Sequence, residues 1–185
     1  MHRRALLDLL ARYAKRRPGE QALVRRFEEF VRGHEDCLSR SCRPGHLTAS
    51  AWILSPCGEQ VLLTHHKKLG KWLQLGGHVD GEPQVERACL REAQEESGMQ
   101  RFSFVSGDDA LTPLDLDVHA IPARAVEPEH LHWDVRFLLQ AAPAQPLVCS
   151  DESNRLEWVE AGALSTFTQE ESVLRLHRKA VELRR

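Results

Sequence analysis

Acidic side chains gather in one short stretch of the sequence, from residue 76 to residue 99. It reads GGHVDGEPQVERACLREAQEESGM and holds six carboxylates between Asp80 and Glu96, beside the adjacent glycines Gly76 and Gly77. Carboxylates are the ligands that hard divalent cations prefer, and glycines let backbone atoms approach a ligand closely because they lack Cβ. The combination therefore points to metal-assisted chemistry on phosphate groups.

These carboxylates lie in a segment that we expect to be helical, from about 83 to 97, ending at Gly98. Its apolar stripe contains Val85, Ala88 and Cys89. On a helical wheel with about 100° per residue, Glu92 and Glu96 lie within about 20° of the stripe, and Glu95 lies about 80° away. Two carboxylates are thus expected to face the protein body, with the third at the flank.

An acidic helix face is most often simply solvated. Here the geometry argues against that reading, because a buried charge without a partner is very costly. One arginine, Arg91, cannot neutralise three glutamates, whereas a divalent cation can. Oxygen ligands with open coordination positions suit Mg²⁺ or Mn²⁺.

Composition excludes several classes of protein. The 185 residues include 25 basic and 27 acidic side chains, so the net charge of −2 produces no field that would attract nucleic acid or an anionic membrane. No apolar run approaches the roughly 20 residues that span a bilayer. The hydrophobic fraction of 42% is sufficient for a sizeable core.

The cysteines and the N-terminus bear on the compartment. The five cysteines are odd in number and include no CxxC pair, which indicates reduced thiols in a cytoplasmic protein. The stretch 1–20 begins basic but carries Asp8 within its apolar part and has no small-residue cleavage signature, so a secretory signal is not expected. Its amphipathic arginines leave an organelle transit peptide as the alternative.

The periodicity predicts an α/β (α+β) sandwich. A helical hairpin ending near Gly33 is expected within an N-terminal extension, 1–45, which is either a packing appendage, a lid or a dimer contact. Residues 46–185 form the second unit. Its predicted strands cover 46–54, 60–66, 114–121, 131–141 and 155–161, and Ser165 or Thr168 is expected to cap a last helix.

Several polar side chains outside the acidic stretch are further candidates. Four basic or imidazole side chains precede the glycines and either meet a phosphate or form a polar turn: His65, His66, Lys67 and Lys68. His132, Asp134 and Arg136 share one face of a predicted strand, as do Asp115, Asp117 and His119 of another, and these faces line either a cleft or the solvent. His78 adjoins Gly77, and Trp72 either stacks on a base or packs in the core. The histidines lack HExxH spacing, so no zinc site is expected.

The acidic stretch resembles the Nudix box, G-x5-E-x7-R-E-U-x-E-E-x-G-U, in which U is aliphatic. Arg91 follows Gly77 by fourteen positions, and REAQEESGM matches every specified position of the second half. One position departs from the pattern: the first glutamate is expected at 83, which is Pro83, and the acid is Glu82. We interpret this as a shortened loop and a helix that begins at Pro83, a position where proline is tolerated.

The resemblance implies an αβα sandwich around a mixed sheet, with the site on the box. By resemblance, the metal ligands are Glu92, Glu95, Glu96, the carbonyl of Gly77 and, six residues before Trp158, Glu152. Arg91 would orient Glu92, and Glu92 or Glu152 would act as the general base, with Glu92 preferred. Substrate contacts are expected from His78, Trp72, Lys68, His132 and Asp134.

The resemblance also implies a function: hydrolysis of a nucleoside diphosphate linked to another moiety, with Mg²⁺ or Mn²⁺ as cofactor. The partner would be that small molecule and no stable nucleic acid or membrane, and a homodimer is compatible with the family. A silent Nudix-fold nucleotide sensor is the alternative, although sensors commonly lose box glutamates that are present here. The isopentenyl diphosphate isomerases, Nudix relatives that use a cysteine and metal-binding histidines, are a third.

Overall fold

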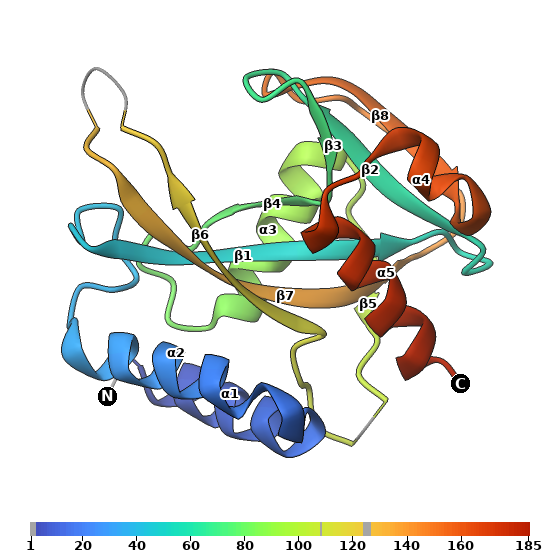
Figure 1. Cartoon of the computed structure of the whole chain (residues 1–185). Helices are drawn as coiled ribbons and strands as arrows, with labels where there is room; N and C mark the ends of the chain where they lie inside the picture. Colours follow the sequence, from blue (N-terminus) through green and yellow to red (C-terminus); the bar gives the residue numbers. More distant parts are fainter. Residues whose placement is uncertain (1–2, 108, 124–126) are drawn as a thin grey trace.

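A mixed sheet of eight strands forms the centre of the molecule, in a computed structural model that describes residues 3–107, 109–123 and 127–185 (Figure 1). The strands are β1 (Gly45–Leu54), β2 (Gln60–His66), β3 (Lys71–Leu73), β4 (Leu75–His78), β5 (Phe102–Phe104), β6 (Asp115–Ile121), β7 (His130–Ala141) and β8 (Ser153–Glu160). The order is β3-β2-β1-β7-β5, while β4 pairs with β1, β6 with β7 and β8 with β2. The β1–β7 pair is parallel, and the other pairs are antiparallel.

Helices cover both faces of the sheet, which confirms the predicted fold class (Figure 1). They are α1 (Arg4–Arg16), α2 (Gln21–Gly33), α3 (Val85–Ser97), α4 (Leu164–Phe167) and α5 (Glu171–Leu183), with short 3₁₀ turns at Pro18–Glu20 and Ala161–Ala163. Apolar residues of α1, α2 and α3 form one core cluster with the sheet. Those of α4 and α5 form a second cluster on the other face.

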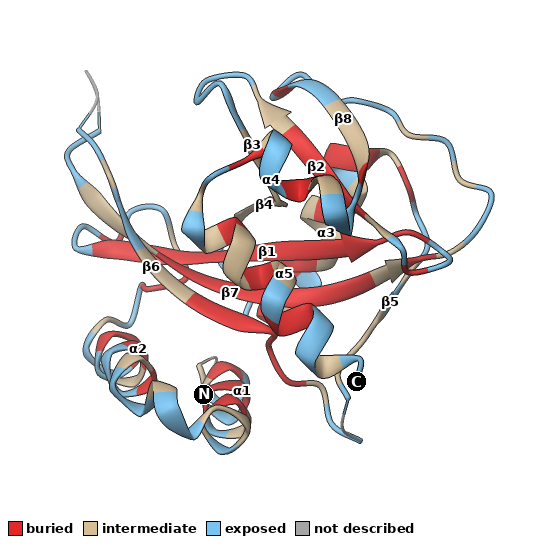
Figure 2. Cartoon of the chain, turned by 45° about the vertical axis from the view of Figure 1, so that its right-hand side comes forward, coloured by how far each residue is buried: buried red, intermediate tan, exposed pale blue. Residues whose placement is uncertain are grey.

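The two faces of β1 differ, and the difference creates room for a site. Its odd positions from Leu47 to Ile53 belong to the first core cluster. Its even positions end in Trp52 and Leu54, which pack in the second cluster, but begin with the polar side chains His46, Thr48 and Ser50. The whole strand is buried, as Figure 2 shows. A polar patch is therefore enclosed at one end of an otherwise apolar strand.

The N-terminal helical hairpin is present as predicted. Phe27 and Phe30 of α2 pack against Trp133 of β7, with ring centroids 5.1 and 4.4 Å apart. The segment after α2 is tied to the rest of the chain by backbone hydrogen bonds, from Leu47 to Cys37 and from Gly81 to Leu38. Its role as a packing element is the one that these contacts favour.

The start of α3 corrects the sequence-based prediction. The helix begins at Val85 after the N-cap Gln84, so Pro83 lies before it and not at its first position. Glu82 Oε1 accepts a hydrogen bond of 2.9 Å from the Gln84 N–H. The carboxylate of Glu82 thus satisfies a backbone donor next to the helix start. At the other end, Gly98 has a φ of 73° and caps the helix as expected.

Two further elements differ from expectation. The stretch predicted as a glycine-rich loop includes β4, which pairs with β1 from Ala51↔Leu75 to Thr48↔His78. Neither Ser165 nor Thr168 is the N-cap of α5, which is Glu170, since Ser165 lies within α4. The Thr168 hydroxyl instead accepts a 3.2 Å hydrogen bond from the Glu170 N–H.

No helix in the described ranges of the chain has both the length and the apolar character needed to cross a membrane. All five cysteines are free thiols.

Candidate active site

Helix α3 presents its carboxylates as the helical wheel predicts. Its apolar stripe is fully buried in the first core cluster. Glu96 is buried, the Glu92 side chain is 15% exposed, and the Glu95 side chain is 63% exposed. Two carboxylates thus face the protein and one lies at the flank.

The two glycines of β4 are what allow these carboxylates to approach the sheet. A Cβ added to Gly77 would fall on the Glu92 carboxylate. Gly76 has a φ of 151°, its N–H donates a 2.7 Å hydrogen bond to Glu96 Oε2, and a Cβ there would lie 2.5 Å from Ser50 Oγ. Gly76 thus requires glycine, because its φ is positive and backbone atoms of Ser50 and Ala49 lie in the way, whereas a side chain at Gly77 would displace the Glu92 carboxylate.

Arg91 links α3 to β4. Its Nη2 donates to Glu92 Oε1 at 2.6 Å and to the backbone oxygen of His78 at 2.6 Å. Its Nε lies 3.8 Å from Glu95 Oε2, a weaker contact at an exposed side chain. The ion pair that the resemblance implies between Arg91 and Glu92 is therefore present, and it holds Glu92 in place relative to β4.

Burial makes the charged forms of these carboxylates unfavourable. The pKa of Glu96 is raised to about 8, chiefly by desolvation and also by the nearby carboxylates of Glu92, Glu152 and Glu95, while the hydrogen bond from Gly76 lowers it. Desolvation also raises the pKa of Glu92, although Arg91 opposes this. Such a cluster of oxygen ligands, short of cations, fits a divalent ion of the Mg²⁺ or Mn²⁺ type.

The raised pKa of Glu96 predicts a pH-dependent stability difference between the wild type and Glu96→Gln. The folded protein binds this proton more tightly than the unfolded chain, so the carboxyl stabilises the fold below its usual pKa of 4.5 and loses that effect as pH rises through about 8. As pH rises between these two values, the free energy of unfolding of Glu96→Gln should therefore increase relative to that of the wild type, by up to about 1.4 kcal/mol per pH unit.

Urea unfolding of both proteins in chelator, at several pH values from 5 to 8, checks this. Comparing the two proteins cancels the contribution of the histidines, and the exposed change Glu29→Gln on α2 serves as the matched control. Parallel curves for the wild type and Glu96→Gln would contradict the expected burial penalty.

The carboxylates lie at one wall of a cavity of about 380 Å³. Glu92, Gly76, Gly77 and Glu152 line it on this side. Two cationic side chains, Arg40 and Lys68, also line it. A polyanion that enters this space meets positive side chains, and it meets the carboxylates only through a cation.

Of the candidate site residues predicted from sequence, nine line this cavity: His66, Lys68, Gly77, His78, Glu92, His119, His132, Asp134 and Glu152. Glu96, Glu95 and Arg91 belong to the same cluster through α3. Trp72 does not line the cavity. Its ring lies 5.2 Å from that of Phe167 and 5.1 Å from that of His65, in the packing of the second core cluster. Stacking of Trp72 on a base in the cavity is therefore not supported.

Sequence reasoning missed other residues that line the cavity: Arg40, His46, Thr48, Ser50 and His130. Arg40 lies in the N-terminal extension and pairs with Asp80 through two hydrogen bonds of 2.7 and 2.8 Å. His46, Thr48 and Ser50 at the start of β1 could have been predicted as site residues. An otherwise apolar strand rarely buries three polar side chains in succession on one face.

The polar faces of β6 and β7 lie neither wholly in the cleft nor in solvent. His119, His132 and Asp134 line the cavity. Further along, Arg136 is buried and pairs with Asp134 at 2.7 Å, and Arg136 and Lys179 of α5 both contact Asp115. Asp134 also accepts hydrogen bonds from Thr48 at 3.0 Å and Ser50 at 2.8 Å. The same pair of strands therefore builds both a cavity wall and a buried ionic network.

Three of the histidines that line the cavity are held neutral. The pKa of His46 and of His78 is lowered to about 4, and that of His132 to about 2, chiefly by desolvation and also by neighbouring histidines. At neutral pH these imidazoles thus present one donor and one acceptor each.

Comparison with known proteins identifies the family. A family model described as NUDIX domain matches residues 44–181, which is most of the chain. The chain therefore belongs to the Nudix hydrolase family. No curated protein matches it.

Solved structures agree with this assignment. The structure resembles a Nudix-family hydrolase from Clostridium perfringens, with 26% sequence identity and a TM-score of 0.61 over 76% of this chain and 98% of that one. It also resembles a C. elegans Ap4A hydrolase, with 18% identity and a TM-score of 0.58 over 74% of this chain and 95% of that one. An E. coli dihydroneopterin triphosphate pyrophosphohydrolase has 14% identity and a TM-score of 0.55, covering 72% and 92% of the two chains. The last two show the shared fold alone.

Proposed function

We propose that this Nudix hydrolase cleaves a nucleoside diphosphate linked to another moiety, and that the reaction needs Mg²⁺ or Mn²⁺. The observation that carries the proposal is the convergence of Glu92, Glu96 and Glu152 on one side of a cavity that also presents Arg40 and Lys68. Carboxylates repel a pyrophosphate unless a cation lies between them, whereas the basic side chains attract it directly. The cavity thus suits a phosphate anhydride better than an uncharged ligand.

The cation would be held by the box. Its ligands would be the carboxylates of Glu92, Glu95, Glu96 and Glu152 and the backbone oxygen of Gly77. When bound, it supplies charge neutralisation at the phosphates and activation of the attacking water.

The side chains would then divide the remaining work. Glu92, held by Arg91, accepts a proton from the water while the water oxygen attacks one phosphorus. The bond from that phosphorus to the bridging oxygen then breaks. The leaving phosphate keeps the electron pair of the broken bond. Lys68 and Arg40 stabilise the negative charge that both products carry.

The part of the cavity away from the carboxylates would bind the rest of the substrate. His78, His132 and Asp134 also line the cavity and would supply these contacts. The net charge of −2 gives long nucleic acids no general attraction, so the proposed partner is a small molecule. With five free thiols, the proposed compartment is the cytoplasm.

The test is phosphate release with a coupled phosphatase across a panel of nucleoside diphosphate derivatives, in Mg²⁺ and in Mn²⁺, for the wild type beside Glu96→Gln. Cleavage by the wild type that the substitution abolishes is the expected result, and the best substrate defines the subgroup. Folded protein that binds one compound tightly without cleaving it would instead support the nucleotide sensor.

A further inference from the structure

Five histidines gather at one end of the cavity: His46 on β1, His78 on β4, His119 on β6, and His130 and His132 on β7. Strand pairing brings most of them together. His132 is the direct partner of His46 in the parallel pair and of His119 in the antiparallel pair. His130 precedes His132 by two residues and therefore projects from the same face.

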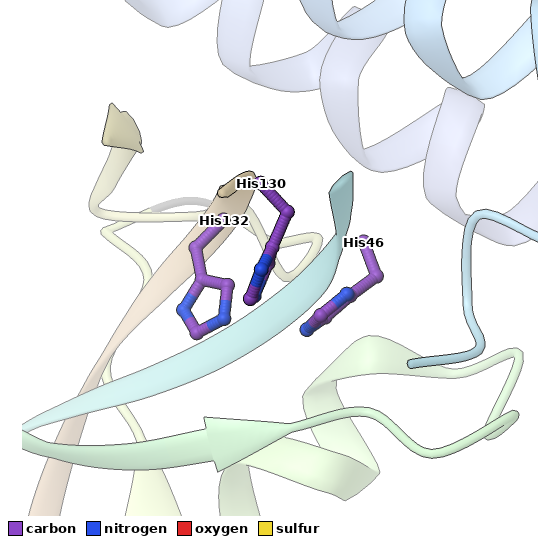
Figure 3. Close-up of side chains that lie close together, drawn as sticks. All are labelled: His46, His130 and His132. Atoms are coloured by element: carbon purple, nitrogen blue, oxygen red, sulfur yellow. The ribbon is translucent and has the colours of Figure 1, made fainter. Parts of the chain in front are cut away.

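Three of these side chains have the arrangement of a metal centre. One ring nitrogen from each of His46, His130 and His132 lies within 4.8 Å of the others. Figure 3 shows the three rings beside one another. Around a tetrahedral zinc with bonds of 2.0–2.1 Å, ligand nitrogens lie about 3.3 Å apart. Small side-chain rotations close the remaining gap.

A second observation points to a ligand at this position. His46 is 4% exposed, and neither of its ring nitrogens has a hydrogen-bond partner in the described part of the chain. The Nε2 of His132 is likewise buried without a partner there. Buried polar side chains are nearly always hydrogen-bonded, and a bound ion is one of the established reasons for an exception.

The third histidine is oriented as a metal ligand would be. His130 Nδ1 lies 2.9 Å from the backbone oxygen of Pro128. Since a carbonyl oxygen only accepts, Nδ1 carries a proton, and in the neutral ring Nε2 then has the lone pair that a metal needs. A histidine that ligates a metal usually donates its other N–H in this way, which holds the ring and its tautomer in place.

We propose that His46, His130 and His132 bind a divalent transition-metal ion of the zinc type at a site separate from the carboxylate cluster. Imidazole nitrogens suit such ions, whereas the carboxylates of α3 suit Mg²⁺ or Mn²⁺. Three protein ligands leave a fourth position, and the site opens into the cavity that Glu92 and Lys68 line at other points. The ion thus provides a second anchor for an anionic group of a molecule bound there.

Cobalt binding tests the proposal without any reference to hydrolysis. Full-length protein treated with chelator and then titrated with Co²⁺ should develop the visible absorption of four-coordinate cobalt, saturate at one ion per chain, and lose the band when Zn²⁺ is added. His46→Gln and the less buried His130→Gln should each weaken binding at least about 100-fold, because even the loss of an outer-shell partner costs 10–100-fold.

Two controls separate this site from its surroundings. His65→Gln should bind Co²⁺ like the wild type, since His65 contacts Asn154 and Trp72 and does not line the cavity. Glu96→Gln should also keep the band, whatever its effect on hydrolysis. A failed activity panel therefore leaves this inference unaffected.

Either of two outcomes would overturn the proposal. One is that the wild type shows no absorption band with Co²⁺, or that the band is unchanged in both His46→Gln and His130→Gln. The other is a metal-free protein that does not take up Co²⁺ but whose His46, His130 and His132 NMR signals shift with inorganic phosphate. That result would make the cluster a direct anion subsite.

Discussion

Replacing Glu92 by glutamine should lower kcat by about 10²–10⁴-fold while KM changes little. Glutamine keeps the size of the side chain and can still accept the hydrogen bond from Arg91, so the packing over Gly77 is preserved. It removes the negative charge and the proton-accepting oxygen. Steady-state kinetics with the best substrate of the panel, at saturating Mg²⁺, measures the effect.

Two further substitutions make this result specific to Glu92. Glu29→Gln on the exposed side of α2 removes the same charge far from the cavity and should leave kcat unchanged. Glu152→Gln should lower kcat by less than Glu92→Gln. If Glu152→Gln has the larger effect, Glu152 is the general base, and the assignment of Glu92 is wrong.

Replacing Arg136 by methionine should destabilise the protein by about 3–5 kcal/mol. Arg136 is 2% exposed, and its guanidinium pairs with Asp134 at 2.7 Å, Asp117 at 3.0 Å and Asp115 at 3.3 Å. Without it, Asp134 keeps only its hydrogen bonds to hydroxyls and has no cation. Urea unfolding should show the loss, and thermal unfolding should show a melting temperature lower by roughly 10 °C.

The control for this prediction is Arg178→Met on α5. Arg178 pairs with Glu171, and both side chains are more than half exposed, so the pair should contribute less than about 1 kcal/mol. Similar losses for Arg136→Met and Arg178→Met would show that the buried network contributes no more than a surface pair. The two substitutions remove the same functional group, which makes burial the variable tested.

The buried network also includes the N-terminal extension. Lys179 of α5 donates to Asp115 at 2.6 Å and to the Tyr13 hydroxyl of α1 at 2.7 Å, and it pairs with Glu20 at 2.5 Å. Burial raises the pKa of Tyr13, so its hydroxyl stays protonated. These contacts join α1, α5 and the edge of the sheet, and they favour a packing role for the extension over that of a lid.

The carboxylate cluster of α3 could be predicted from the spacing of its residues. Helical periodicity is local, so the positions of Glu92 and Glu96 relative to Val85 and Cys89 could be read from spacing alone. The same reasoning placed the termination of α3 at Gly98 and the helical hairpin before residue 33. It failed for the start of α3, because the loop around Glu82 and Pro83 adopts a conformation that spacing does not encode.

The histidine cluster, in contrast, depends on strand pairing that local spacing does not predict. His46 is separated from His132 by 86 positions, and no spacing rule links them, but the parallel register of β1 and β7 makes them neighbours. In the same way, Arg136 lay on a polar strand face that spacing could not assign to cleft or solvent; in the fold it is buried and donates to the backbone oxygen of Ser172 on α5. Strand register and helix docking arise from contacts between distant parts of the chain. For that reason the histidine cluster could not be predicted from the sequence.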